Sequence, residues 1–117
     1  MEFGLKQQKI RGVSMSNMFF KSDKAFSYFM RNGFVYTFRT KRRRLNERVA
    51  IRRSKKEKKV ATGRVVGVVK INDILELKKY VEYSGFASFE EWVEEIKRLN
   101  GGVPAQGWLH KVELVEG

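Results

Sequence analysis

The side chains with the clearest chemistry in this 117-residue chain are the cations of one short stretch. Residues Arg39–Arg64 hold 13 basic and 2 acidic side chains, a net charge of +11 in 26 positions. Guanidinium and ammonium groups at this density attract phosphate and release its counterions, so salt-sensitive binding to nucleic acid is expected. The predicted contacts are Arg39, Lys41, Arg42, Arg43, Arg44, Arg48, Arg52, Arg53, Lys55, Lys56, Lys58, Lys59 and Arg64.

One aromatic residue beside this block could add base stacking. Tyr36 lies three positions before Arg39, and aromatic side chains next to cations are typical of single-strand binding proteins. The alternative is a place in the core, and for Phe34 and Phe38, which share the same strand face, this is the interpretation we favour.

The charge is divided unevenly along the chain. Residues 1–70 carry 20 basic and 4 acidic side chains, whereas residues 71–117 carry 5 basic and 9 acidic ones. Other interpretations of the basic block are a solvated surface, an anionic membrane partner or an acidic protein partner. A solvated surface would need nearby carboxylates to relieve repulsion, and only Glu47 and Glu57 lie within the block. If the flanking strands pair as a hairpin ladder, the two basic turns at 40–46 and 53–59 would approach each other.

Catalysis is restricted by the side chains that the chain lacks. It has no cysteine and one histidine, which excludes disulfides, thiolate nucleophiles, Cys-ligated metals and multi-His centres. His110 lies on the apolar face of a predicted strand and is expected to be structural. No metal site and no cofactor are predicted, and the glutamates at 90–95 are interpreted as a solvated helix face. A rival hypothesis is an enzyme acting on nucleosides or RNA, with Thr37 or Tyr36 beside Arg39 and with Asp73 or Glu76 as acid/base.

The chain alternates between helical and extended sequence patterns, and these predicted helices and strands must position the candidate site residues. Ser22 and Gly33 are predicted to cap a helix over 22–32. Gly63 and Gly67 indicate a bulge or bend in a β-branched strand. The other expected elements are strands at 34–39, 48–52, 60–71 and 107–115, a helix capped by Asn72 that runs to about 84, and a helix over 88–100 with a Ser88/Glu91 capping box.

This order predicts an α+β protein, a small mixed β-barrel with flanking helices. Residues 1–17 show no sustained periodicity and are expected to form a flexible arm before a single domain at 18–117. No apolar run is long enough to cross a membrane, so we expect a cytoplasmic protein without membrane insertion. The absence of cysteine and the low Gln and Asn content also fit a source from a hot environment. A third hypothesis for function is a protein-interaction module that uses the acidic C-terminal helix face.

The residue order resembles the ASCH domains of the PUA-like superfamily. The likeness covers about residues 18–116. It rests on Asn32-Gly33, on the strand Tyr36-Thr37-Phe38-Arg39, on the strand Val65–Ile71, on the helix that begins at Ser88 and on the closing strand Trp108–Leu114. The resemblance implies a PUA-like β-barrel and an RNA partner in preference to DNA. It also implies a second possibility, because some members are amidohydrolases acting on acetylated cytidine and others are proposed ribonucleases.

The hydrolase signature of that family is Gly-x-Lys-x-x-Thr-x-Arg. Aligned on Thr37 and Arg39, the lysine position holds Phe34 and the glycine position holds Asn32. The amine that would activate the threonine is therefore missing. Asp73 and Glu76 are the candidates for the family's acidic residue. On these residues the resemblance favours a binding module over a hydrolase.

Overall fold

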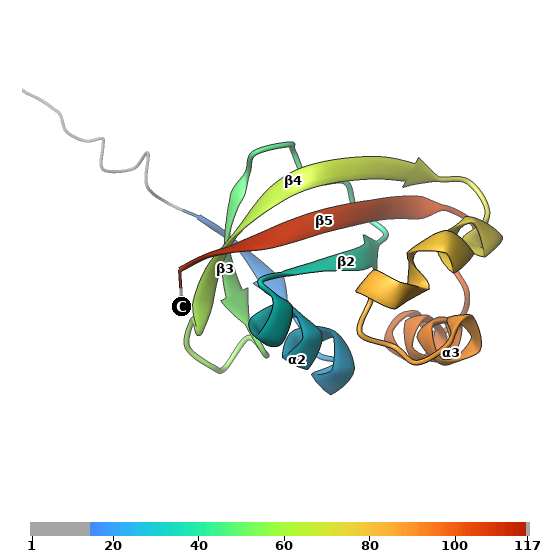
Figure 1. Cartoon of the computed structure of the whole chain (residues 1–117), viewed down its shortest axis with the longest axis horizontal. Helices are drawn as coiled ribbons and strands as arrows, with labels where there is room; N and C mark the ends of the chain where they lie inside the picture. The colour runs from blue at the N-terminus through green and yellow to red at the C-terminus, as the bar shows by residue number, and fades with distance from the viewer. Residues whose placement is uncertain (1–14, 117) are drawn as a thin grey trace, which may run out of the picture.

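The structure, a computed structural model, describes residues 15–116 and has an α+β fold. Its five strands form one sheet that curls into a half-barrel, with helices beside it (Figure 1). The strand order across the sheet is β1-β3-β4-β5-β2, so β1 and β2 are the edges. The elements are β1 (Ser16–Phe19), α2 (Asp23–Asn32), β2 (Phe34–Arg39), β3 (Arg48–Arg52), β4 (Ala61–Ile71), the 3₁₀ helix η1 (Ile74–Tyr83), α3 (Phe89–Asn100) and β5 (Gly107–Glu116).

The first helix, α2, connects the two edge strands of the sheet. Its buried Phe29 stacks on Phe20, which follows β1, with ring centroids 5.5 Å apart. Gly33 ends the helix in the left-handed conformation with φ +82°, and its N–H donates to the Phe29 carbonyl over 2.8 Å. The predicted helix and its C-terminal cap are confirmed. Ser22 occupies the N-cap position, but its side chain makes no capping hydrogen bond.

The long β4–β5 ladder gives the sheet its curl. Its register shifts between Thr62 and Gly63 and again between Val65 and Gly67, which confirms the predicted bulges. A side chain at Gly63 would collide with the core, because a Cβ there would lie 2.9 Å from Val112 Cγ1. The strand therefore bends at a glycine where the neighbouring strand leaves no room for a side chain.

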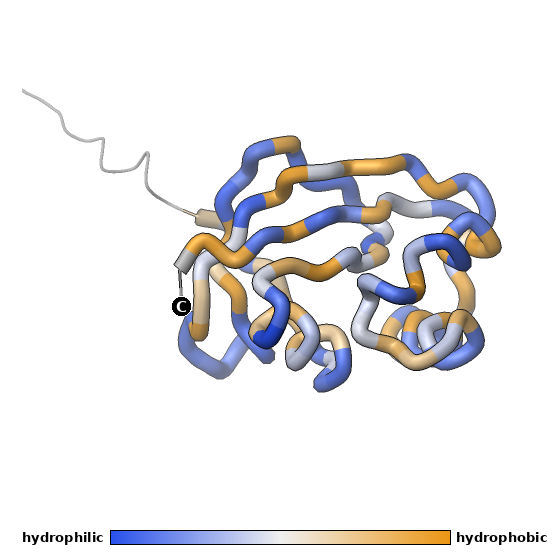
Figure 2. The backbone as a smooth tube through the Cα atoms, in the orientation of Figure 1, coloured by the Kyte–Doolittle hydropathy of each residue, from blue (hydrophilic) through white to orange (hydrophobic). Residues whose placement is uncertain are grey.

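Apolar side chains from alternate strand positions fill the inside of the half-barrel. Val35, Val65 and Val112 come from three adjacent strands and are fully buried. Figure 2 shows this alternation along β5 and a mostly hydrophobic middle in β4, and it shows hydrophilic chain in the two segments on either side of β3. No helix within residues 15–116 is long and apolar enough to span a membrane.

Two expectations differ from the structure. The helix predicted to begin after Asn72 is a 3₁₀ helix capped by Asp73, whose carboxylate accepts a 2.9 Å hydrogen bond from the Leu75 N–H. The expected domain start at residue 18 falls inside β1, because Ser16 and Asn17 pair in parallel with β3. The remainder of the expected arm, residues 1–14, lies outside the described residues.

The capping of α3 is close to the prediction. Ser88 Oγ accepts a 3.1 Å hydrogen bond from the Glu91 N–H, as a capping box requires. The Glu91 carboxylate, however, accepts from the Ala87 N–H over 2.7 Å instead of returning to Ser88. The two residues still fix the start of the helix through their side chains.

Candidate nucleic-acid interface

The two basic segments lie at opposite ends of β3, as Figure 1 shows. β2 pairs with β5, and β3 pairs with β1 and β4, so β2 and β3 form no hairpin. The expected hairpin ladder is therefore half present: β3 and β4 pair across the basic turn at 53–59 and bring Arg48 opposite Arg64, but the two basic turns do not come together. The five residues of β3 separate the turns by roughly 16 Å at strand spacing. The basic face is an elongated surface, with cations at both ends of one strand.

Three arginines of the block are used to satisfy the backbone of β1 and the residue after it. Arg39 Nη1 donates to the Phe19 carbonyl over 2.8 Å. Arg43 Nη2 donates to the Asn17 carbonyl over 2.6 Å, and Arg53 Nε donates to the Phe20 carbonyl over 2.7 Å. An edge strand otherwise exposes unpaired carbonyl groups. Arginine side chains therefore bind this edge in place of a sixth strand.

Arg43 is also the centre of a polar cluster inside the curl. Its backbone N–H donates to His110 Nε2 over 3.0 Å, and its guanidinium donates to Ser16 and Glu47. Burial raises the pKa of Glu47, but hydrogen bonds from Ser16, the Arg44 N–H and Arg43 outweigh it, so the pKa lies below its usual value. Glu47 therefore stays ionised and orders the segment that follows β2.

His110 is fully buried and neutral at physiological pH. Burial, followed by the positive charges of Arg39 and Arg43, lowers its pKa to about 4. Its Nδ1 is buried and has no hydrogen-bond partner among the described residues. Burial also lowers the pKa of Arg39, to about 10, with a further contribution from Arg43. His110 therefore acts as a hydrogen-bond acceptor in the core, in agreement with the structural role expected for it.

The remaining cations of the block are exposed. We call the nine residues that are exposed and make no ion pair with a described side chain the exposed cations. Arg42 packs against Trp108, with its guanidinium carbon 5.5 Å from the ring centroid. Arg52, in contrast, is half-buried and donates to Asn17 Oδ1 and to the Glu57 carbonyl. The exposed cations are Lys41, Arg42, Arg44, Arg48, Lys55, Lys56, Lys58, Lys59 and Arg64.

Two of the exposed cations face each other across a ladder. Arg48 and Arg64 are directly opposite partners in the antiparallel β3–β4 pair. Like charges in this position oppose strand pairing. A cross-strand arginine pair on a solvent-exposed face therefore lowers stability, and an anion bound between the two side chains would relieve it.

Tyr36 lies in an aromatic cluster. Its ring stacks on Tyr80 at 5.4 Å and lies 5.5 Å from Tyr83, both on η1. Phe38 is buried, 8% exposed, as expected of a core residue, but the same expectation for Phe34 is wrong, because its ring is partly exposed in this cluster. Sequence reasoning did not place Lys111 here, because only the pairing of β2 with β5 brings it beside Tyr36. It also did not place Tyr80 and Tyr83 against this ring, because that contact depends on η1 packing against β2.

The residues of the rival enzyme hypothesis are only partly brought together. Thr37 and Arg39 line a pocket of about 320 Å³ between the ends of β1 and β2 and α3. Tyr36, Asp73 and Glu76 do not line it. Asp73 caps η1, and the Thr37 hydroxyl accepts a 3.1 Å hydrogen bond from Arg39 Nε. No lysine or carboxylate within residues 15–116 hydrogen-bonds Thr37.

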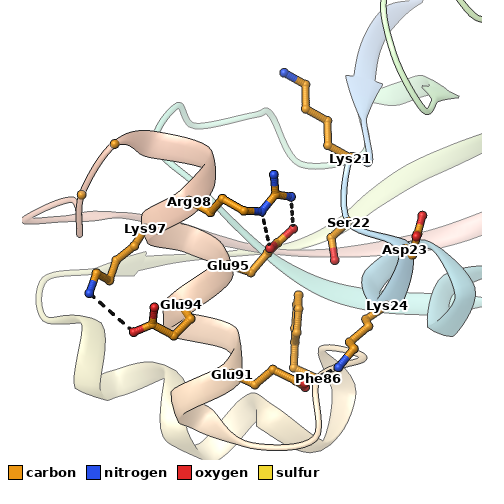
Figure 3. A pocket seen from close by; sticks show the side chains of 12 residues that line it. Lys21, Ser22, Asp23, Lys24, Phe86, Glu91, Glu94, Glu95, Lys97 and Arg98 are labelled. Atoms are coloured by element: carbon orange, nitrogen blue, oxygen red, sulfur yellow. Dashed lines mark hydrogen bonds and ion pairs between the residues drawn. The ribbon is translucent and has the colours of Figure 1, made fainter.

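A second hollow of about 810 Å³ lies between the start of α2 and α3. Figure 3 shows three pairs of its charged side chains directed at one another, with Lys21 and Asp23 pointing away from them. Lys24 pairs with Glu91, Arg98 with Glu95 at 2.6 Å, and Lys97 with Glu94 at 3.5 Å. These carboxylates are neutralised within the domain, and in the described chain no group of three or more potential metal ligands comes together.

Comparisons with protein-family models, with curated proteins and with solved structures found no match to this chain.

Proposed function

We propose that this chain is a nucleic-acid-binding domain with a PUA-like, ASCH-type architecture, and that its preferred partner is RNA. The curled five-strand sheet with flanking helices is compatible with that architecture. The preference for RNA follows from the resemblance of the sequence to ASCH domains. The phosphates are bound by the exposed cations, and Arg39, Arg43, Arg52 and Arg53 stabilise the fold that presents them.

One observation carries the proposal: the cross-strand pair of Arg48 and Arg64 on an exposed face. A solvated surface selected only for solubility has no reason to place two arginines opposite each other, because the arrangement costs stability. A polyanion gains from the same arrangement, because adjacent guanidinium groups bind successive phosphates. Exposed cations at both ends of β3 extend the surface beyond this pair.

The test compares the binding of single-stranded RNA, duplex RNA and duplex DNA by the full chain and by two charge-reversed variants. Arg42→Glu/Arg44→Glu and Arg48→Glu/Arg64→Glu should each lower RNA affinity by about tenfold or more and reduce the salt slope by about 1.4, at 0.7 per lost single-strand contact. Arg43 stays unchanged, because its hydrogen bonds hold β1 and the segment after β2.

The matched control is Lys78→Glu/Lys97→Glu, which makes the same change in net charge at two exposed residues of η1 and α3. Its affinity should stay within about threefold of the unchanged protein. Equal losses in the control and in the two test variants would show that net charge alone matters, and would contradict the proposed face.

A hydrolase acting on a modified nucleoside or RNA is the second candidate, because Thr37 and Arg39 share the 320 Å³ pocket. The arrangement does not favour a threonine nucleophile. Arg39 donates to its hydroxyl, and Phe34 stands where the related hydrolases have lysine. Release of cytidine from acetylated cytidine, lost in Thr37→Val, would support this candidate over a binding module. The protein-interaction hypothesis is disfavoured by the internal pairing of the α3 carboxylates.

A further inference from the structure

One row of side chains crosses four strands on the outer face of the sheet. Phe34 of β2 is opposite Glu113 of β5, Glu113 is opposite Arg64 of β4, and Arg64 is opposite Arg48 of β3. Directly opposite residues project to the same face, and adjacent strands are about 4.8 Å apart, so the row is roughly 14 Å long. An aromatic ring thus stands at one end of a line that ends in two arginines.

The ring belongs to a cluster of five, here called the aromatic platform: Tyr28, Phe34, Tyr36, Tyr80 and Tyr83. All five are partly exposed, and they come from α2, β2 and η1. No hydrogen bond within the described chain involves any of the four tyrosine hydroxyls, and none of these hydroxyls is buried. Buried tyrosines normally bond their hydroxyl to a protein partner. The phenol groups of the platform are therefore open to solvent.

Lys111 connects the platform to the row of charges. It lies opposite Tyr36, and its ammonium is 5.3 Å from the centroid of Phe34 and 6.0 Å from that of Tyr36. The residue opposite Lys111 on β4 is Gly67, where a Cβ would lie 3.3 Å from Lys111 Cβ. The missing side chain at Gly67 leaves the lysine room to move between the rings and the neighbouring strand.

We propose that the aromatic platform stacks bases of single-stranded nucleic acid, and that Lys111, Arg64 and Arg48 bind the phosphates that follow. The inference rests on the proposed function and adds a preference for single strands over duplexes. A base takes the place of the Lys111 ammonium over Phe34 and Tyr36, and the ammonium turns to a phosphate. Only an unpaired base can lay its face on a protein ring, because duplex bases are stacked on each other.

Glu113 opposes this binding. Its carboxylate stands between Phe34 and Arg64 in the row, and it lies 3.8 Å from the Lys111 ammonium. An incoming phosphate must compete with it for the lysine and approach a negative charge. Glu113→Gln should therefore strengthen binding, the reverse of what substitution of the arginines or the rings does. A surface of general positive charge without this geometry would respond much less to one neutralised carboxylate.

The experiment compares a single-stranded homopolymeric RNA with an abasic strand of the same length and with duplex RNA. The unchanged protein should bind the intact strand most tightly. Phe34→Leu/Tyr36→Leu keeps apolar packing but removes both rings. It should weaken binding to the intact strand by about 5- to 150-fold, the equivalent of one stacked base, and leave the abasic strand, the duplex and the salt slope unchanged. Glu113→Gln should bind the intact strand more tightly.

The matched control is Phe89→Leu, which removes a partly exposed ring under Lys78, outside the platform. It should leave every affinity unchanged. Binding of the abasic strand as tightly as the intact strand by the unchanged protein overturns the platform and leaves the phosphate-binding face standing. Equal losses for intact and abasic strands in the ring variant also overturn it. If none of the three nucleic acids is bound in a salt-dependent way, the proposed function and this inference are both overturned.

Discussion

Arg39 on β2 donates a hydrogen bond from Nη1 to the carbonyl oxygen of Phe19 on β1, 2.8 Å away, and so joins the two edges of the curled sheet. Its guanidinium also lies 4.9 Å from the centroid of the Phe20 ring. The same residue type that gives the protein its positive charge thus connects the two edges of the half-barrel. This divides the basic block into arginines that build the fold and cations that are exposed.

Arg39→Ala should lower the free energy of unfolding by roughly 2–4 kcal/mol, because it leaves the Phe19 carbonyl unpaired at the seam between β1 and β2 and removes packing on Phe20. Urea unfolding measures the change. Arg44→Ala, at an exposed cation in the same block, should change stability by no more than about 0.5 kcal/mol. Equal and small effects at both positions would show that Arg39 does not hold the seam.

Stability should fall between pH 6.5 and pH 4 because of His110. The imidazole has an ordinary pKa of 6.5 and a folded pKa of about 4, so in this window the unfolded chain takes up a proton that the folded chain does not. The contribution is complete above pH 6.5 and is lost as the pH falls towards 4, by about 3 kcal/mol in total.

Urea unfolding across this pH range checks the His110 prediction. His110→Gln can still accept the Arg43 N–H bond but does not titrate, so its stability should depend less on pH in the same window. The pKa of Glu47 lies below its usual value, which places its own titration in more acidic solution. Identical pH profiles for the two proteins would contradict the assignment of the proton uptake to His110.

The arginine pair on β3 and β4 should lower the free energy of unfolding and raise the affinity for RNA. Arg48→Thr removes the like charge opposite Arg64 and should raise the free energy of unfolding by a few tenths to about 1 kcal/mol. The same substitution should lower affinity for RNA. Arg44→Thr, at an exposed cation outside the strands, should lower affinity without the gain in stability. A stabilised Arg48→Thr variant with unchanged RNA affinity would show that the pair does not bind phosphate.

Local sequence patterns predicted most of the helices and strands. The elements they did not predict depend on pairing between strands that are distant in the sequence. The helix that ends at Gly33 and the bends at Gly63 and Gly67 follow from residue types at single positions. β1 has only four residues, too few for a periodicity, and it is recognised only by its pairing with β3.

The candidate site was predictable in composition but not in detail. Arg39 and Arg42 are both arginines of the same basic block, and the sequence does not distinguish their roles. Only the fold shows that Arg39 reaches the Phe19 carbonyl while Arg42 lies on Trp108. The strand pattern places Lys111 and His110 on opposite faces of the sheet. The position of Lys111 beside Tyr36, however, depends on β5 lying next to β2. Neither fact can be obtained from charge counts, because both depend on which strands are neighbours.

The central claim is that the exposed cations bind the phosphates of a nucleic acid, and the salt dependence of affinity for single-stranded RNA tests it most directly. We predict that the logarithm of the affinity falls with the logarithm of the salt concentration with a slope steeper than about −3, which corresponds to more than four phosphate contacts at about 0.7 each. A slope shallower than about −1, or no binding at low salt, would contradict the claim.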